Sequence, residues 1–234
     1  SSATEKLAAV ANKNGTGVWV IAHEFGNNNY KAFLFTSSGL SNTVTSSIGI
    51  SHSGNTSHGI GCMKFSPDGT KLAAAIYTNE DKVELFSFDN STGSVTGNLK
   101  QYQLGQANDN PYGISFSSDG KLLYVSCWSS SNSNGHVYQY NLADPTNTAF
   151  SVATGSSSTF GAIQLGPDNK IYVSRFSTPT PVSVLDVINN PDVIGSGCNY
   201  VASQVNLSPG KSQGGLPNFV EGLDRSVTVS PDIT

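Results

Sequence analysis

Residues 59–88 read GIGCMKFSPDGTKLAAAIYTNEDKVELFSF, and this stretch decides the fold because two later stretches of the chain repeat its design. Its apolar residues form three runs: the first ends at Phe65, the second covers residues 72–77 and the third covers residues 83–88. Short apolar runs of this length, bounded by turn residues, predict β-strands. We therefore expect a three-stranded unit in which no residue is catalytic.

The turn between the first two runs is Ser66-Pro67-Asp68-Gly69. Pro67 fixes φ near the value that the second position of a turn requires, Asp68 can hydrogen-bond to the backbone that follows it, and Gly69 accepts a positive φ. A Pro-Asp-Gly turn between two apolar runs predicts a β-hairpin. We therefore assign Asp68 and Lys71 to the turn rather than to a functional site.

The same strand–turn–strand pattern recurs along the chain. The turn glycines Gly15, Gly69 and Gly120 are 54 and 51 residues apart, and Asn169 takes the glycine position 49 residues later. Asparagine is one of the few other residues that tolerate a positive φ. Each copy is followed by further apolar runs, so each repeat contains four expected strands and no helical pattern.

Four repeats of this length predict a β-propeller whose blades are four-stranded antiparallel sheets. The expected blades cover residues 5–57, 58–110, 111–160 and 161–215, within a propeller region of residues 1–222. A β-sandwich is the alternative, but a sandwich does not require one strand–turn–strand sequence to recur at regular spacing. We therefore favour an all-β propeller in which continuous apolar second strands pack between neighbouring blades.

The residues that follow the fourth repeat indicate that four blades do not complete the ring. Residues 216–222 look like the inner strand of a further blade, and residues 223–234 are expected to be a linker or the start of a following domain. Closed propellers leave no long exposed edges. We therefore expect an open arc or part of a larger, seven-bladed ring, with the remaining blades upstream of Ser1 or on a separate piece.

The composition excludes two classes of partner. Charged residues make up 12% of the chain, the net charge is −4, and lysine and arginine are scattered singly. Without a basic stripe for phosphate groups, nucleic-acid binding is not expected. No run approaches the roughly 18 apolar residues of a membrane-spanning helix, and no signal peptide opens the chain. We therefore expect no insertion into a membrane.

No motif for a metal, a cofactor or a nucleophile stands out. Cys62, Cys127 and Cys198 are 65 and 71 residues apart, which excludes CxxC pairs and predicts small buried side chains. The histidines show neither HxH nor HExxH spacing, and the acidic loop residues form no D-x-D-x-D-G calcium loop. No G-x-S-x-G elbow is present. We therefore expect no metal site, no cofactor and no catalytic residue.

His23 and Glu24 are the most suggestive pair, because a histidine beside a carboxylate can act as an acid or a base. Adjacent residues on a strand point to opposite faces of the sheet, which makes cooperation between them difficult. We therefore favour a structural histidine at the end of a strand.

Propeller geometry predicts where a ligand would bind. The loops that enter the inner strands and those that join second to third strands share one face, which includes residues 23–29, 128–134 and 175–181. Tyrosine and tryptophan among serine and asparagine suit recognition of a sugar or a peptide. Packing of Trp128 between blades is the alternative. The predicted ligand-binding residues are His23, Glu24, His58, Tyr112, Trp128 and Arg175.

Three stretches of the chain resemble one protein family. Residues 5–25 read EKLAAVANKNGTGVWVIAHEF, residues 161–176 read GAIQLGPDNKIYVSRF, and residues 185–220 read LDVINNPDVIGSGCNYVASQVNLSPGKSQGGLPNFV. They resemble the propeller of large Bacteroidetes surface proteins that use type IX secretion and often carry a gliding-motility-associated, type B sorting domain. The resemblance implies an extracellular, cell-surface location. The residues after Phe219 depart from the family pattern, so a sorting domain is not implied for this chain.

These observations lead to one main expectation and two alternatives. The main expectation is a non-enzymatic extracellular binding or scaffold module of a large secreted surface protein, such as an adhesin used in attachment or gliding motility. Its expected partners are a protein or glycan ligand at the cell surface and the remaining blades. A lactonase-like enzyme is the first alternative, since lactonase propellers resemble this chain in their hairpins. A docking unit for the secretion or motility machinery is the second.

Overall fold

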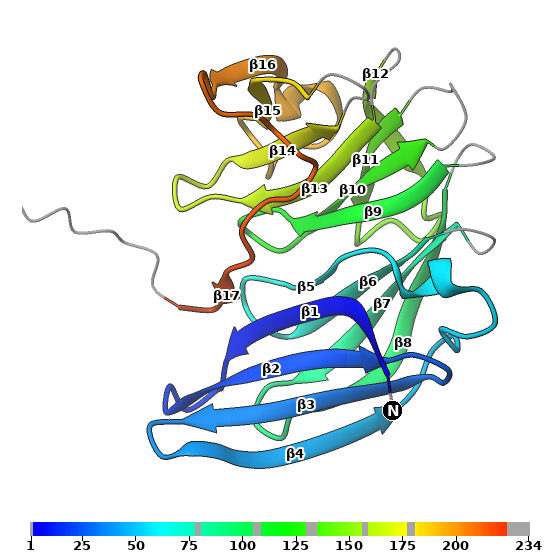
Figure 1. Ribbon diagram of the computed structural model, residues 1–234, viewed down its shortest axis with the longest axis vertical. Helices are drawn as coiled ribbons and strands as arrows, with labels where there is room; N and C mark the ends of the chain where they lie inside the picture. The colour runs from blue at the N-terminus through cyan, green and yellow to red at the C-terminus, as the bar shows by residue number, and fades with distance from the viewer. Residues whose placement is uncertain are drawn as a thin grey trace, which may run out of the picture.

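The computed structural model describes residues 2–77, 81–104, 109–129, 135–155, 159–176 and 181–223. Within these ranges the chain forms seventeen strands and two short 3₁₀-helices, η1 (Thr56–Gly59) and η2 (Gly195–Cys198). Sixteen of these strands make four antiparallel blades, in each of which the strands follow one another in sequence order. The blades are arranged as a β-propeller (Figure 1). The predicted fold class is therefore confirmed.

Each blade runs from an inner strand to an outer strand. Blade 1 contains β1 (Ala3–Ala11), β2 (Gly17–Glu24), β3 (Asn29–Thr36) and β4 (Gly39–Ser47). Blade 2 contains β5 (Met63–Phe65), β6 (Lys71–Ile76), β7 (Lys82–Asp89) and β8 (Ser94–Gln103). Blade 3 contains β9 (Asp109–Phe116), β10 (Leu122–Ser129), β11 (Gly135–Asn141) and β12 (Ala149–Gly155). Blade 4 contains β13 (Thr159–Leu165), β14 (Ile171–Phe176), β15 (Val184–Ile188) and β16 (Tyr200–Asn206).

The hairpin turn between the first two strands is the same in all four blades. The backbone N–H of Gly69 donates to the carbonyl three residues earlier at 2.8 Å, and those of Gly15, Gly120 and Asn169 do the same at 3.0, 3.0 and 3.1 Å. At these positions φ lies between +60° and +68°. Asn169 therefore adopts the left-handed conformation that its place in the repeat predicts.

The second strand of a middle blade is apolar on both of its faces. In β6, Leu72 and Ala74 pack in the core shared with blade 1, whereas Ala73 and Ala75 pack in the core shared with blade 3. Burial of one large aliphatic side chain contributes about 1.5–3 kcal/mol. Packing between sheet faces therefore holds the blades together, which explains the continuous apolar run of this strand.

Residues 207–219, which we call the closing segment, lead from blade 4 back to blade 1 (Figure 1). They are followed by β17 (Val220–Glu221), which pairs in parallel with Ala9 and Val10 of β1. The strand expected to begin a further blade thus extends the sheet of blade 1. The physical reason is that β1 would otherwise present unpaired backbone groups at its edge. Of the expected linker, residues 224–234 lie outside the described ranges.

Asp68→Ala should destabilise the hairpin turn without affecting ligand binding. The carboxylate of Asp68 accepts hydrogen bonds from the hydroxyl of Ser66 and from the N–H and hydroxyl of Thr70, the last two at 3.1 and 2.8 Å. Their loss should lower the free energy of unfolding by roughly 1 kcal/mol. Urea unfolding followed by circular dichroism measures this effect, with Lys13→Ala in the exposed turn of blade 1 as the control. A variant as stable as the parent chain would contradict this role for Asp68.

Candidate functional site

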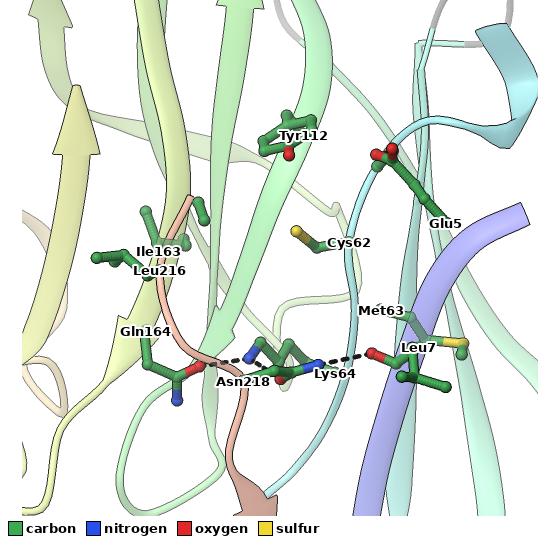
Figure 2. A pocket seen from close by; sticks show the side chains of 12 residues that line it. Glu5, Leu7, Cys62, Met63, Lys64, Tyr112, Ile163, Gln164, Leu216 and Asn218 are labelled. Carbon is green, nitrogen blue, oxygen red and sulfur yellow. Dashed lines mark hydrogen bonds between the residues drawn. The ribbon is translucent and has the colours of Figure 1, made fainter. Parts of the chain in front are cut away.

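A cavity of about 260 Å³ lies where the inner strands of the four blades converge. All four inner strands and the closing segment line it, and each contributes one of Leu7, Met63, Tyr112, Ile163 and Leu216 (Figure 2). The propeller therefore creates a central space that no single blade contains.

Lys64 closes one end of the central cavity. It is only 7% exposed, and its Nζ donates hydrogen bonds to Oε1 of Gln164 and to Oδ1 of Asn218 (Figure 2). Asn218 in turn donates to the backbone carbonyl of Leu7 at 2.7 Å. A buried ammonium group requires such acceptors, because its removal from water is costly. These bonds join β5, β13, the closing segment and β1.

The other end of the cavity carries a carboxylate and an aromatic ring. Oε1 of Glu5 accepts a hydrogen bond from the N–H of Gly61 at 2.7 Å, and Tyr112 lines the same end (Figure 2). Cys62 lies between the two ends, and burial raises the pKa of its thiol to about 11. Because the thiolate is the reactive form, Cys62 is a poor nucleophile at neutral pH.

Four aromatic side chains, one of which is Tyr112, form a cluster at this end of the cavity. The ring of Trp128 lies 5.6 Å from that of Tyr112, 6.4 Å from that of Tyr77 and 5.0 Å from that of Phe176, measured between ring centroids. All four side chains are half-buried. They come from blades 2, 3 and 4, so this aromatic cluster exists only when the blades stand side by side. Tyr112 belongs both to the cluster and to the lining of the cavity.

The structure brings together two of the six predicted ligand-binding residues, Tyr112 and Trp128. The ring of Trp128 packs against residues of the neighbouring blades and is half-buried, and a ligand-binding role for it stays a prediction. Arg175 is engaged elsewhere: its Nε donates to Oδ2 of Asp186 at 2.7 Å, and its guanidinium carbon lies 5.7 Å from the ring centroid of Phe160. Of the predicted loops, residues 130–134 and 177–180 lie outside the described ranges.

His23 belongs to the packed seam between blades 1 and 2. Its buried ring stacks on that of His52 with 3.7 Å between centroids and meets the ring of Tyr30 edge-on at 4.5 Å. Tyr30 continues the contact to Phe86 of blade 2 at 5.3 Å. Burial lowers the pKa of His23 to about 4 and that of His52 to about 2. Both rings are therefore neutral at physiological pH.

Glu24 and His58 make local contacts. Oε2 of Glu24 accepts hydrogen bonds from the side-chain amides of Asn27 and Asn29, both at 2.9 Å. Nδ1 of His58 lies 2.8 Å from the backbone carbonyl oxygen of Ser53. His23 and Glu24 point to opposite faces of β2, as the alternation of a strand predicts. These contacts explain three of the predicted residues as parts of the scaffold, and a ligand-binding role for them stays a prediction.

The residues that close the cavity were missed, although the repeat contains a signal for them. Lys64, Ser115 and Gln164 each lie two residues before the turn of their repeat, in an inner strand. A polar residue at this position in three repeats breaks an otherwise apolar run, and it marks the side chains that converge on the axis. Tyr77 and Phe176 offered no comparable signal, since each simply ends an apolar strand.

The described residues contain no group of three or more histidine, cysteine, aspartate or glutamate side chains placed to hold a metal ion. In the same ranges no helix has the length and apolar character needed to cross a membrane. What the site offers is therefore hydrogen-bonding groups and aromatic surface.

No family model matches the sequence, and neither does any curated protein. Among solved structures, the chain is similar to the PQQ domain of pyranose dehydrogenase from Coprinopsis cinerea, with a TM-score of 0.56 and 12% identity over 78% of this chain and 50% of that one. It is similar to a Bacteroides uniformis protein proposed to be a 6-phosphogluconolactonase, with a TM-score of 0.50 and 19% identity over 77% of this chain and 49% of that one. It is also similar to the WD40 domain of Toxoplasma gondii coronin, with a TM-score of 0.50 and 13% identity over 78% of this chain and 42% of that one. These likenesses show the propeller fold, and the chain spans about half of each solved chain.

Lys64→Met should destabilise the propeller by removing the hydrogen bonds across the axis. Gln164 is itself buried, and a buried polar group left without its partner costs about 1–3 kcal/mol. Denaturant unfolding measures the loss. Lys121→Met is the matched control, because the Lys121 side chain is 77% exposed and its ion pair with Asp119 should contribute little. Equal unfolding midpoints for the two variants would contradict a structural role for Lys64.

Acidification should destabilise the seam between blades 1 and 2. In the unfolded chain His23 and His52 take up protons near pH 6.5, whereas in the folded chain the pKa values are about 4 and about 2. The unfolded state therefore binds more protons below pH 6.5, and the free energy of unfolding should fall as the pH drops from 6.5 towards 4. In His52→Phe this fall should be smaller. Parallel pH profiles for the two proteins would contradict the assignment.

Proposed function

We propose that this chain is a non-enzymatic binding and scaffold module of a larger cell-surface protein, and that its ligand is a glycan or a peptide. The observation that carries the proposal is the half-buried aromatic cluster of Tyr77, Tyr112, Trp128 and Phe176 at one end of the central cavity. Three blades build it, and its rings are partly accessible. An accessible aromatic surface next to a cavity is the usual setting for ligand recognition.

The cluster suits a ligand with both apolar and hydroxyl-bearing or amide-bearing faces. Aromatic rings provide large, rigid contact surfaces, and tyrosine hydroxyls add hydrogen bonds at the edge. Glu5, at the same end of the cavity, is exposed and provides acceptor oxygens beside Tyr112. Sugar rings and extended peptides combine these properties, which favours them over a purely apolar or strongly charged ligand.

The groups that line the cavity favour binding over catalysis. Glu5 is the one carboxylate among the lining residues, and no histidine is among them. Lys64 is held by Gln164 and Asn218, and the thiol of Cys62 stays protonated at neutral pH. A lactonase-like activity would need several carboxylates or histidines converging on the axis, so we place it second to a binding role.

The extracellular location rests on the sequence resemblance of residues 5–220 to type IX-secreted surface proteins. Within such a protein, a ligand at the cell surface would make this propeller part of an adhesin for attachment or gliding motility. Docking to the secretion or motility machinery is the other role consistent with an extracellular location. The two roles differ in the chemistry of the partner, which an experiment can separate.

Binding of the purified chain to arrays of bacterial and host surface glycans and of peptides tests the proposal. Trp128→Ala should abolish the array signal while the melting temperature shows that the variant is folded. Phe150→Ala is the matched control, since Phe150 is 40% exposed on β12 of blade 3, outside the cluster. Of the two tryptophans Trp19 is 1% exposed, so a ligand-induced change in fluorescence reports Trp128.

Retention of the array signal in folded Trp128→Ala would exclude the aromatic cluster as the binding site. Absence of any array signal, together with recovery of a secretion or motility component from surface extracts, would favour the docking role instead.

A further inference from the structure

The rings of the aromatic cluster are set at steep angles to one another. The plane of the Trp128 ring makes an angle of 78° with that of Tyr112 and of 84° with that of Tyr77. The ring of Phe176 is tilted by 45° against that of Trp128. Near-perpendicular rings form corners in which a small group contacts two rings at once. Such corners suit a cation, because the face of an aromatic ring carries partial negative charge.

Two carboxylates lie close to the aromatic cluster. Burial raises the pKa of Tyr112 to about 12, with further contributions from Cys62 and Glu5. Burial also raises the pKa of Tyr77, and the carboxylate of Asp81 adds to this effect. Each carboxylate is therefore near enough to one ring of the cluster to act on it electrostatically. A cation bound at the cluster would be attracted by both carboxylates as well as by the rings.

Three basic side chains near this end of the chain's axis are bound within the protein. Lys6 is fully buried on β1, and its Nζ donates to two backbone carbonyls at 2.9 and 2.8 Å. Lys64 closes the opposite end of the central cavity, and Arg175 pairs with the buried carboxylate of Asp186. Glu5, in contrast, is exposed and lies across the cavity from Tyr112 (Figure 2). Its carboxylate therefore gives this end of the cavity a negative character.

The spacing of the rings limits the shape of the group that carries the charge. The centroid of Trp128 lies 5.0 to 6.4 Å from those of the other three rings, so the rings are in contact with one another. A pyranose ring cannot enter between rings at this separation. An ammonium group at the end of a slender aliphatic chain can rest in a corner between two of them. A lysine side chain has this shape, whereas the amino group of an amino sugar is attached directly to the sugar ring.

We infer that the ligand is a peptide segment that presents a lysine side chain, and that its ammonium group binds at the aromatic cluster beside Glu5. The aliphatic stem of the lysine would contact the rings, while the ammonium group would be held by the ring faces and the carboxylate. This inference rests on the proposed binding function and specifies its ligand.

The fluorescence of Trp128 in the whole chain tests this preference, since Trp19 is buried. The two probes are a pentapeptide with blocked ends and a central lysine, and the same peptide with norleucine, which has the aliphatic stem but no ammonium group. The lysine peptide should bind about tenfold more tightly than the norleucine peptide, as expected for a cation held by aromatic rings and a carboxylate. This difference should become smaller as the salt concentration is raised.

Glu5→Gln should weaken the preference for lysine without affecting the fold. Glutamine keeps a side-chain oxygen that can accept the hydrogen bond from the N–H of Gly61, but it carries no charge. The lysine peptide should bind several-fold more weakly to this variant, while the affinity for the norleucine peptide stays the same. Asp168→Asn is the matched control, because Asp168 is an exposed carboxylate in the hairpin turn of blade 4. Equal effects of the two substitutions would contradict the role of Glu5.

Equal affinities of the parent chain for the two peptides, including no binding of either, would overturn the inference. Tighter binding of a glucosamine oligomer than of the lysine peptide would also overturn it, because the ligand would then be an amino-sugar glycan. In both cases an array signal that depends on Trp128 would leave the proposed binding function standing. An array signal that does not depend on Trp128 would instead contradict the proposed site, and the inference with it.

Discussion

The two middle blades are sheets with two apolar faces, and this constraint governs the rest of the structure. Such a sheet is stable only between two neighbours, because burial of apolar surface supplies most of its stability. In β10, Leu123 and Val125 pack towards blade 2, whereas Leu122 and Tyr124 pack towards blade 4. Sheets that must be covered on both faces stack side by side, and their right-handed twist turns the stack around an axis. The repeat therefore produces an arc of blades whose inner strands converge.

Convergence of the inner strands determines what the axis can contain. Where backbones touch, a side chain is excluded: a Cβ on Gly161 would lie 2.2 Å from the carbonyl oxygen of Gly214 in the closing segment. Where they separate, the central cavity remains, and Lys64 closes it with hydrogen bonds to Gln164 and Asn218. One lysine thus links β5 of blade 2, β13 of blade 4 and the closing segment.

The same packing separates the roles of the predicted site residues. Tyr112 and Trp128 come together with Tyr77 and Phe176 because the ends of neighbouring blades meet beside the axis. His23 instead packs in the seam between blades 1 and 2, where its ring stacks on that of His52. Burial lowers the pKa values of both histidines, so both rings are uncharged at neutral pH. Their role is to pack between blades 1 and 2.

The repeat, the hairpin turns and the four-stranded blades could be predicted from the sequence. Those features follow from local rules, namely the positive φ at Gly69 and its equivalents and the apolar runs of the strands. Which side chains come into contact depends on the way the blades pack together. Lys64 and Gln164 are 100 residues apart in the chain, and the aromatic cluster joins three blades. The repeat marks Lys64 and Gln164 as polar positions of inner strands, but the partners that they contact depend on how far each blade is rotated about the axis. The pairing of β17 with β1 likewise depends on where the closing segment meets a free strand edge.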